Sequence, residues 1–207
     1  MDTNLPPILD FNNETNYGTL FDTRDGQSYP VVKIGKQIWL AENFRYLPSI
    51  KDKGDKYENS MIPDNSYLDP DNSYLDKGYG RLYDWNTAMN IAPEGWKLPN
   101  NQDFIELKDF VIKDNNLDDE DEVGRYLKSV NGWNIVNNDK YGFNAKPVAC
   151  YTKDRGLGIR SNFGNFWSAS TNKVYHWNLI YDIEDLKNYA YPSSDTDMGF
   201  NVRLIKN

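Results

Sequence analysis

The side chains that most often carry out enzymatic chemistry are scarce in this chain. It contains one histidine, His176, and one cysteine, Cys150, among 207 residues. A Ser-His-Asp triad or a Cys-His pair would therefore depend on a single imidazole, and the sequence has neither a G-x-S-x-G elbow nor a glycine-rich phosphate loop. A structural zinc site needs four Cys or His ligands. The sequence therefore predicts a protein that is not an enzyme and has no cofactor, with Cys150 as a small buried side chain.

Calcium is the one ion that the acidic residues leave open, because hard cations bind carboxylate and carbonyl oxygens. Asp114, Asn116 and Asp118 have the spacing of the first three ligands of an EF-hand loop. The pattern then fails, because Asp119 stands where the loop requires glycine and Arg125 stands where it requires a bidentate glutamate. We interpret this segment as a solvated acidic loop between two helices.

A second candidate site lies near the C-terminus, where aromatic and acidic side chains share one loop. Tyr189 and Tyr191 precede Asp195 and Asp197, and these two aspartates are candidates to share a cation with Asp182. Exposed tyrosines give a large contact area at low entropic cost. The alternative is that some of the 15 tyrosines lie at the surface for lack of room inside. The candidate ligand-binding residues are His176, Asn178, Asp182, Tyr189, Tyr191, Asp195 and Asp197.

The charge of the chain limits its partners. The formal net charge is -8, and the basic residues form no cluster or stripe. This balance argues against nucleic acid and anionic membrane surfaces, because phosphate contacts need clustered Lys and Arg. The sequence also has no apolar run of the length that a membrane-spanning helix needs, so we expect no direct membrane insertion. The expected partner is a glycan or a protein.

The elements expected to position the candidate residues are strands. In residues 175–183, YHWNLIYDI, apolar and polar side chains alternate with the period of a half-buried strand. His176, Asn178 and Asp182 then lie on the polar side of that strand. The apolar side consists of Tyr175, Trp177, Leu179, Tyr181 and Ile183. The pattern recurs in a closing strand at Phe200, Val202 and Leu204.

Earlier segments predict a hairpin and helices. Residues 28–40 are typical of a β-hairpin, with Gly35 and Lys36 as a type II′ turn. Asn100 or Asn101 is expected to cap a helix whose first turn contains Asp103. Apolar residues at helical spacing predict short helices over residues 81–92, 101–111 and 120–130.

The length and the order of these elements predict one α+β domain over residues 17–207. Residues 1–16 are expected to be a tail or linker. The segment 50–78 is expected to be a surface insertion, and it contains a tandem repeat of PDNSYLD over residues 63–76. Short helices are expected in the first half, a loop-rich second half follows, and the terminal strands are expected to pair.

Several segments of the chain, in order, carry a resemblance to one family. They lie in residues 18–29, 32–43, 80–85, 92–99, 127–133, 142–147, 166–170 and 199–203, and include Gly80-Arg81-Leu82-Tyr83, Ala92-Pro93-Glu94-Gly95-Trp96 and Phe166-Trp167-Ser168-Ala169-Ser170. This set resembles the Fibrobacter succinogenes major paralogous domain, a family of secreted or surface-attached bacterial proteins that is frequent in Bacteroidetes. The resemblance covers residues 17–206.

The resemblance implies a C-type-lectin-like fold, an extracellular or cell-surface location, in some cases as a lipoprotein, and a variable surface over residues 171–198. The related formylglycine-generating enzymes use a cysteine pair, whereas this chain has only Cys150. Calcium-dependent lectins carry Glu-Pro-Asn or Gln-Pro-Asp together with Trp-Asn-Asp, and this chain has none of these motifs. We therefore expect a non-enzymatic module that binds a glycan or protein through residues 171–198, helped by the insertion. The alternative is a structural or adhesive component of a surface fibre, pilus tip or phage tail.

Overall fold

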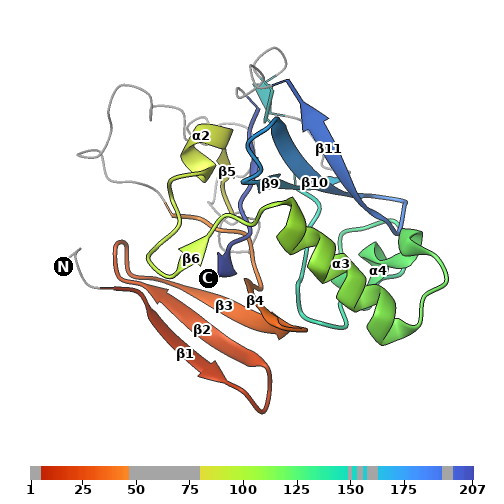
Figure 1. Cartoon of the computed structure of the whole chain (residues 1–207), viewed down its shortest axis with the longest axis horizontal. Coiled ribbons are helices and arrows are strands. Elements are labelled where there is room, and N and C mark those ends of the chain that lie inside the picture. Colours follow the sequence, from red (N-terminus) through yellow and green to blue (C-terminus); the bar gives the residue numbers. More distant parts are fainter. Residues whose placement is uncertain (1–5, 47–79, 149–150, 153–155, 158–162, 193–197) are drawn as a thin grey trace.

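The computed structural model describes residues 6–46, 80–148, 151–152, 156–157, 163–192 and 198–207. Strands outnumber helices in these residues, so the architecture is α+β to mainly β (Figure 1). Most of the strands belong to two sheets, and β7 (Tyr151–Thr152) and β8 (Gly156–Leu157) form a separate pair. The insertion expected at 50–78, its repeat and Cys150 lie outside the described residues.

The first sheet is built mainly from the N-terminal part of the chain, in the order β1-β2-β3-β4-β13-β6. Its strands are β1 (Ile8–Asn12), β2 (Tyr17–Asp22), β3 (Gln27–Ile34), β4 (Gln37–Leu40), β6 (Trp96–Lys97) and β13 (Ile205–Lys206). The predicted hairpin is confirmed, because β3 pairs with β4 and Ile34 lies opposite Gln37. Gly35 connects them with φ +60°, as the first position of a type II′ turn requires.

Strand β1 lies within the segment that was predicted to be a tail or linker, residues 1–16, so that prediction is wrong for residues 8–12. Leu9 and Phe11 are half-buried and pack against the core, whereas Asp10 between them is exposed. This alternation is the period of a strand with one buried face. It covers a single short strand, which gains its hydrogen bonds by pairing along the whole of its length with β2.

The second sheet has the order β11-β10-β9-β12-β5. Its strands are β5 (Leu82–Tyr83), β9 (Phe163–Ser168), β10 (Val174–Ile180), β11 (Leu186–Tyr191) and β12 (Phe200–Asn201). All neighbours are antiparallel except β9 and β12. The second half of the chain is therefore richer in strands than expected, because β9, β10 and β11 hydrogen-bond to one another as an antiparallel meander.

The C-terminal strands join the two sheets. β12 pairs with β5 and β9 in the second sheet, and β13 lies between β4 and β6 in the first. The expected pairing of terminal strands therefore holds for β13 with the β3–β4 hairpin, but not with β1 at the edge of the sheet. The reason is the strand order: β1 lies at the far edge of the sheet and pairs with β2, whereas β4 pairs with β13, where Trp39 lies opposite Ile205.

Arg203 lies between β12 and β13 and is fully buried. Its guanidinium donates hydrogen bonds to the Asn43 side-chain oxygen and to the carbonyl oxygens of Leu40 and Phe143. It also lies over the Phe143 ring, at 4.6 Å from the centroid. Burial lowers the pKa of Arg203 to about 9. These contacts tie the junction of the two sheets to the segment between α4 and β7 that contains Phe143.

Helix α3 (Asn101–Asn115) is the longest helix of the described residues, and the sequence predicted its start correctly. The Asn100 side chain accepts from the Asp103 backbone nitrogen, and the Asp103 carboxylate accepts from the Asn100 backbone nitrogen. This reciprocal pair is a capping box, which satisfies backbone donors at the helix start. The helix ends at Asn116, which adopts the left-handed conformation with φ 51°.

The other two predicted helices are shorter than expected. Residues 81–92 contain only α2 (Trp85–Ala88), capped by Asp84, because Leu82 and Tyr83 pair with β12 as strand β5. Residues 120–130 contain a 3-10 turn (Glu120–Glu122) and α4 (Gly124–Leu127). α4 ends there because Lys128 forms a bridge with Ala145. Buried residues on both sides of each short helix produced the longer helical pattern in the sequence.

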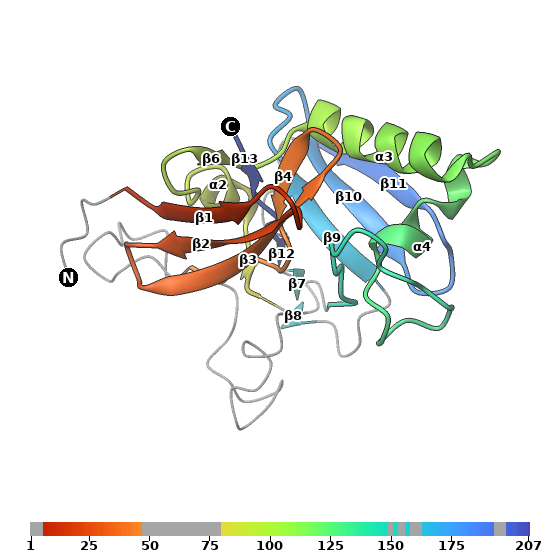
Figure 2. The same cartoon turned by 90° about the horizontal axis from the view of Figure 1, so that it is seen from below.

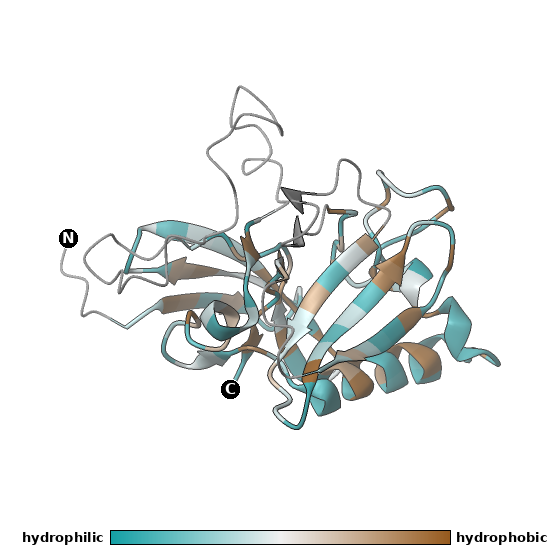
Figure 3. Ribbon diagram, turned by 90° about the horizontal axis from the view of Figure 1, so that it is seen from above, coloured by the Kyte–Doolittle hydropathy of each residue, from teal (hydrophilic) through white to brown (hydrophobic). Residues whose placement is uncertain are grey.

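Helix α3 lies across one face of the second sheet (Figure 2). The Phe104 ring stacks on the Trp177 ring of β10, with centroids 5.2 Å apart, and Leu107 and Leu179 belong to the same core. Hydrophobic and hydrophilic bands alternate along α3 and along the strands of this sheet (Figure 3). One face of β10 is therefore fixed by the helix, and the opposite face is left to form a site.

Residues of α4 and the residue that follows it hold the turn after β10 in place. The buried Lys128 ammonium donates to the carbonyl oxygens of Ile180 and Ile183, at 2.6 and 2.5 Å. Gly124 donates its backbone N–H to Glu184, and a Cβ at Gly124 would lie 2.5 Å from that carbonyl oxygen. Only glycine permits this approach, so α4 fixes the end of β10.

Candidate functional site

The register of three strands brings polar side chains together on the face of the second sheet that is turned away from α3. Asn178 of β10 lies opposite Asn165 of β9, and His176 lies opposite Tyr189 of β11. Because side chains alternate along a strand, His176 and Asn178 point away from Trp177. The sequence predicted this shared side of β10 correctly. The sequence did not predict that this side of β10 is buried. His176 is only 3% exposed and Asn178 only 5%.

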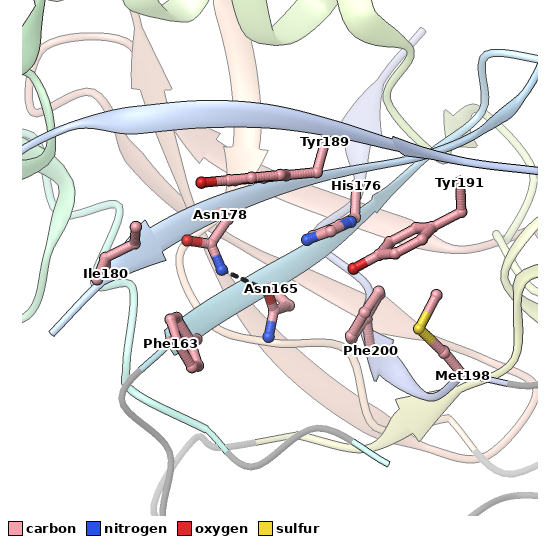
Figure 4. Close-up of a pocket in the computed structure, with 9 residues that line it drawn as sticks. All are labelled: Phe163, Asn165, His176, Asn178, Ile180, Tyr189, Tyr191, Met198 and Phe200. Atoms are coloured by element: carbon pink, nitrogen blue, oxygen red, sulfur yellow. Dashed lines mark hydrogen bonds between the residues drawn. The ribbon is translucent and has the colours of Figure 1, made fainter. Parts of the chain in front are cut away.

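These residues line a pocket of about 290 Å³. Side chains from β9 and β12 form one side, and side chains from β11 form the other (Figure 4). The lining consists of Phe163, Asn165, His176, Asn178, Ile180, Tyr189, Tyr191, Met198 and Phe200. Its volume is at the lower end of the range for small-molecule pockets. The pocket therefore has room for one small group.

Aromatic rings surround the imidazole of His176. The rings of Tyr189 and Tyr191 lie nearly parallel to it, with centroids at 5.5 and 5.3 Å and interplanar angles of 17° and 13°. The Phe200 ring is closer, at 4.5 Å. These contacts hold the imidazole in one orientation. Of the rings that line the pocket, Phe163 and Tyr189 remain the most exposed, at 40% and 42%, and they stand on opposite sides of β10.

Among the described residues, the pocket lining contains no Asp, Glu, Lys or Arg. Its one titratable group near neutral pH is His176, and burial lowers the pKa of this imidazole to about 4. His176 is therefore neutral at physiological pH. The chemistry of the pocket comes from one neutral imidazole, two primary amides and two phenols.

Two polar atoms of the pocket residues have no hydrogen-bond partner among the described residues. They are the Nδ1 atom of His176 and the Oδ1 atom of Asn178, and both are buried. The other end of the Asn178 amide is satisfied, because its Nδ2 atom donates to Asn165 Oδ1 at 2.5 Å. A buried polar atom without a partner costs roughly 1–3 kcal/mol. Such atoms are uncommon in folded proteins and indicate that a further polar group belongs here.

The predicted site residues have three different outcomes. The structure brings His176, Asn178, Tyr189 and Tyr191 together in the pocket. Asp182 is exposed in the turn after β10 and does not line the pocket, so its predicted position on the polar side of the strand is wrong. The strand ends at Ile180, and Asp182 lies within the turn to β11, which separates this carboxylate from the pocket. Asp195 and Asp197 lie outside the described residues.

Several pocket residues were missed from the sequence. Asn165 and Phe163 alternate in β9, but their proximity to Asn178 depends on pairing between strands. Phe200 was assigned to the closing strand as a core residue. The alternation of apolar residues correctly predicted that Phe200 is buried in a strand. This pattern alone does not show which buried ring borders a pocket.

The EF-hand-like segment is not arranged as a metal site. The Asp114 carboxylate accepts hydrogen bonds from Lys140 Nζ and the Tyr141 hydroxyl, at 2.8 and 2.7 Å. These bonds lower the pKa of Asp114. Asn116 ends helix α3. Within the described residues, no group of three or more His, Cys, Asp or Glu side chains is placed to hold a metal ion.

Comparison with known proteins identifies a family for the chain. A family model described as the Fibrobacter succinogenes major domain matches residues 32–206. No curated protein and no solved structure matches the chain. In the described part of the chain, no helix has both the length and the apolar character needed to cross a membrane.

Proposed function

The chain belongs to the Fibrobacter succinogenes major domain family, and we propose that it is a non-enzymatic, surface or secreted module that binds a glycan or protein. The ligand contacts the pocket between β9 and β11, within a scaffold of the C-type-lectin-like kind. The observation that carries this proposal is that, among the described residues, one pocket without charged side chains combines two unpaired buried polar atoms with exposed aromatic rings. The extracellular location is supported by the family resemblance alone.

Binding explains this pocket better than catalysis. A general base works best when its pKa lies near the working pH, whereas burial lowers the pKa of His176 to about 4. Among the described residues, the pocket lining supplies no carboxylate to orient the imidazole. A neutral, stacked imidazole that lacks a hydrogen-bond partner is suited to receive a polar group of a ligand.

The test is a pair of arrays, one of glycans and one of peptides, probed with the full chain. The variant Tyr189→Ala removes an exposed pocket ring. The matched control Tyr17→Ala removes a tyrosine that is 49% exposed on β2, in the other sheet. We expect hits on one array that are lost in Tyr189→Ala and kept in Tyr17→Ala. Hits that survive the pocket variant, or no hits on either array, contradict the proposal and favour a structural role.

A further inference from the structure

We infer that the pocket accepts one uncharged sugar ring, with an apolar face against Tyr189 and hydroxyl groups paired to His176 and Asn178. This inference rests on the proposed function and narrows it to one class of ligand. It also assigns the binding to side chains alone, without a metal ion.

The first step is the charge of the ligand. Moving a carboxylate, phosphate or ammonium group into a pocket without a counter-charge is costly, because the ion loses its hydration. None of the described residues that line this pocket is an Asp, Glu, Lys or Arg, and His176 is neutral. Charged sugars and charged peptide side chains are therefore disfavoured, whereas a neutral glycoside enters without leaving an ion unpaired.

The second step is the hydrogen bonding. The unpaired atoms, His176 Nδ1 and Asn178 Oδ1, need a polar group that the described chain does not provide. The Oδ1 atom accepts only, and the tautomer of the imidazole decides whether Nδ1 donates or accepts. A hydroxyl group both donates and accepts, so it suits either case. Because the terminal torsion of an asparagine is broad, Oδ1 can turn toward a hydroxyl that enters the pocket.

The third step is the shape of the ligand. Tyr189 and Phe163 flank β10 and keep about two fifths of their surfaces exposed, at 42% and 40%. Between them lies a polar strip formed by the amides of Asn165 and Asn178 (Figure 4). The complementary ligand has an apolar face and a polar edge. A pyranose ring has both, because its axial C–H groups form faces and its hydroxyl groups form the rim.

The fourth step concerns a peptide, the other ligand class of the proposed function. An extended peptide gains affinity chiefly by pairing its backbone with a free strand edge. In the described residues, β11 is the outermost strand of its sheet and offers such an edge. The pocket, however, lies on the face of the sheet. A peptide at the β11 edge would leave the unpaired atoms of His176 and Asn178 without partners.

The experiment titrates the 15N-labelled full chain with methyl α-glucopyranoside, methyl α-mannopyranoside, methyl β-galactopyranoside and methyl β-glucopyranosiduronic acid. The side-chain amide signals of Asn165 and Asn178 are followed by NMR. We expect at least one neutral glycoside to shift them saturably, with equal affinity in calcium chloride and in excess EDTA. The charged uronide should bind at least about tenfold more weakly, because its carboxylate has no partner. Failure of all neutral glycosides, equal or tighter binding of the uronide, or a requirement for calcium overturns the inference.

Two variants tie the effect to the pocket. Tyr189→Ala should weaken the neutral glycoside about tenfold by loss of stacking, whereas Tyr17→Ala should leave its affinity unchanged. Asn178→Ala should weaken it similarly, and the remaining Asn165 signal reports whether the pocket is still folded. If the glycosides fail while Tyr189-dependent hits persist on the peptide array, this inference falls and the proposed function stands. If neither array gives such hits, the proposed function itself falls.

Discussion

The variant His176→Phe tests whether burial keeps the pocket imidazole neutral. Phenylalanine preserves a planar ring beside Tyr189 and Tyr191, whose centroids lie 5.5 and 5.3 Å from the imidazole, but it cannot be protonated. It also removes the unpaired Nδ1 atom. We therefore expect the variant to fold and to be about as stable as the wild type near neutral pH. Removing the unpaired buried nitrogen saves its desolvation cost, and this gain offsets the cost of packing the larger phenyl ring.

The magnitude follows from the pKa of His176, which burial lowers from 6.5 to about 4. Because the unfolded chain takes up this proton at a higher pH than the folded chain does, the free energy of unfolding falls as the pH is lowered through this window. The slope approaches about 1.4 kcal/mol per pH unit. The wild type should lose about 2 kcal/mol through this group between about pH 7.5 and about pH 5. The variant should not show this loss.

The assay is urea denaturation of both proteins at several pH values across this window. The quantity to compare is the difference in unfolding free energy between variant and wild type. Burial raises the pKa of Asp139 to about 6, which gives the opposite pH dependence, but this group is present in both proteins and cancels. A difference that stays constant from neutral to acidic pH would refute the buried, neutral imidazole and the electrostatic argument for an uncharged ligand.

Four substitutions test the fold around the site, each by urea denaturation. Asn100→Ala removes the capping box of α3 and should cost about 1 kcal/mol; no change would show that the cap is dispensable. Asp139→Asn removes a carboxylate whose pKa burial raises to about 6. Because wild-type stability from this group is lost as pH rises through that value, the variant should be more stable near neutral pH, by about 1 kcal/mol after solvent screening, and the gain should vanish below about pH 4. Tyr191→Ala should cost about 2 kcal/mol, since Tyr191 packs against the core, and Tyr189→Ala under about 1 kcal/mol; equal costs would contradict this difference.

Local signals in the sequence predicted the elements that depend on nearby residues. The cap of α3 needs only Asn100 and Asp103, which are three residues apart, and the β3–β4 hairpin needs the turn at Gly35. The alternation along β10 correctly placed His176 and Asn178 on one face. The family resemblance, stated on ordered segments, is confirmed over residues 32–206.

The missed features depend on contacts between distant residues. The pairing of Asn165 with Asn178 is set by the register of β9 and β10, which no local pattern encodes. The polar face of β10 appeared solvent-facing in the sequence, yet rings from β11 and β12 bury His176. Tyr191 illustrates the same effect, because it packs partly on the core whereas Tyr189 stays exposed. The sequence grouped the two tyrosines as one surface.

The position of β12 and β13 has a consequence for how this protein folds during synthesis. Both strands lie within residues 200–206, yet each enters a different sheet, where β12 pairs with β9 and β13 pairs with β4. Until the ribosome has released this segment, the edges of β4 and β9 have no partners from it. Contacts that join such distant parts of a chain slow folding. Until those contacts form, the unpaired strand edges promote aggregation. The β1–β4 hairpins can therefore form early, but the sheet face that carries the pocket is completed only after residues 200–206 have been synthesised.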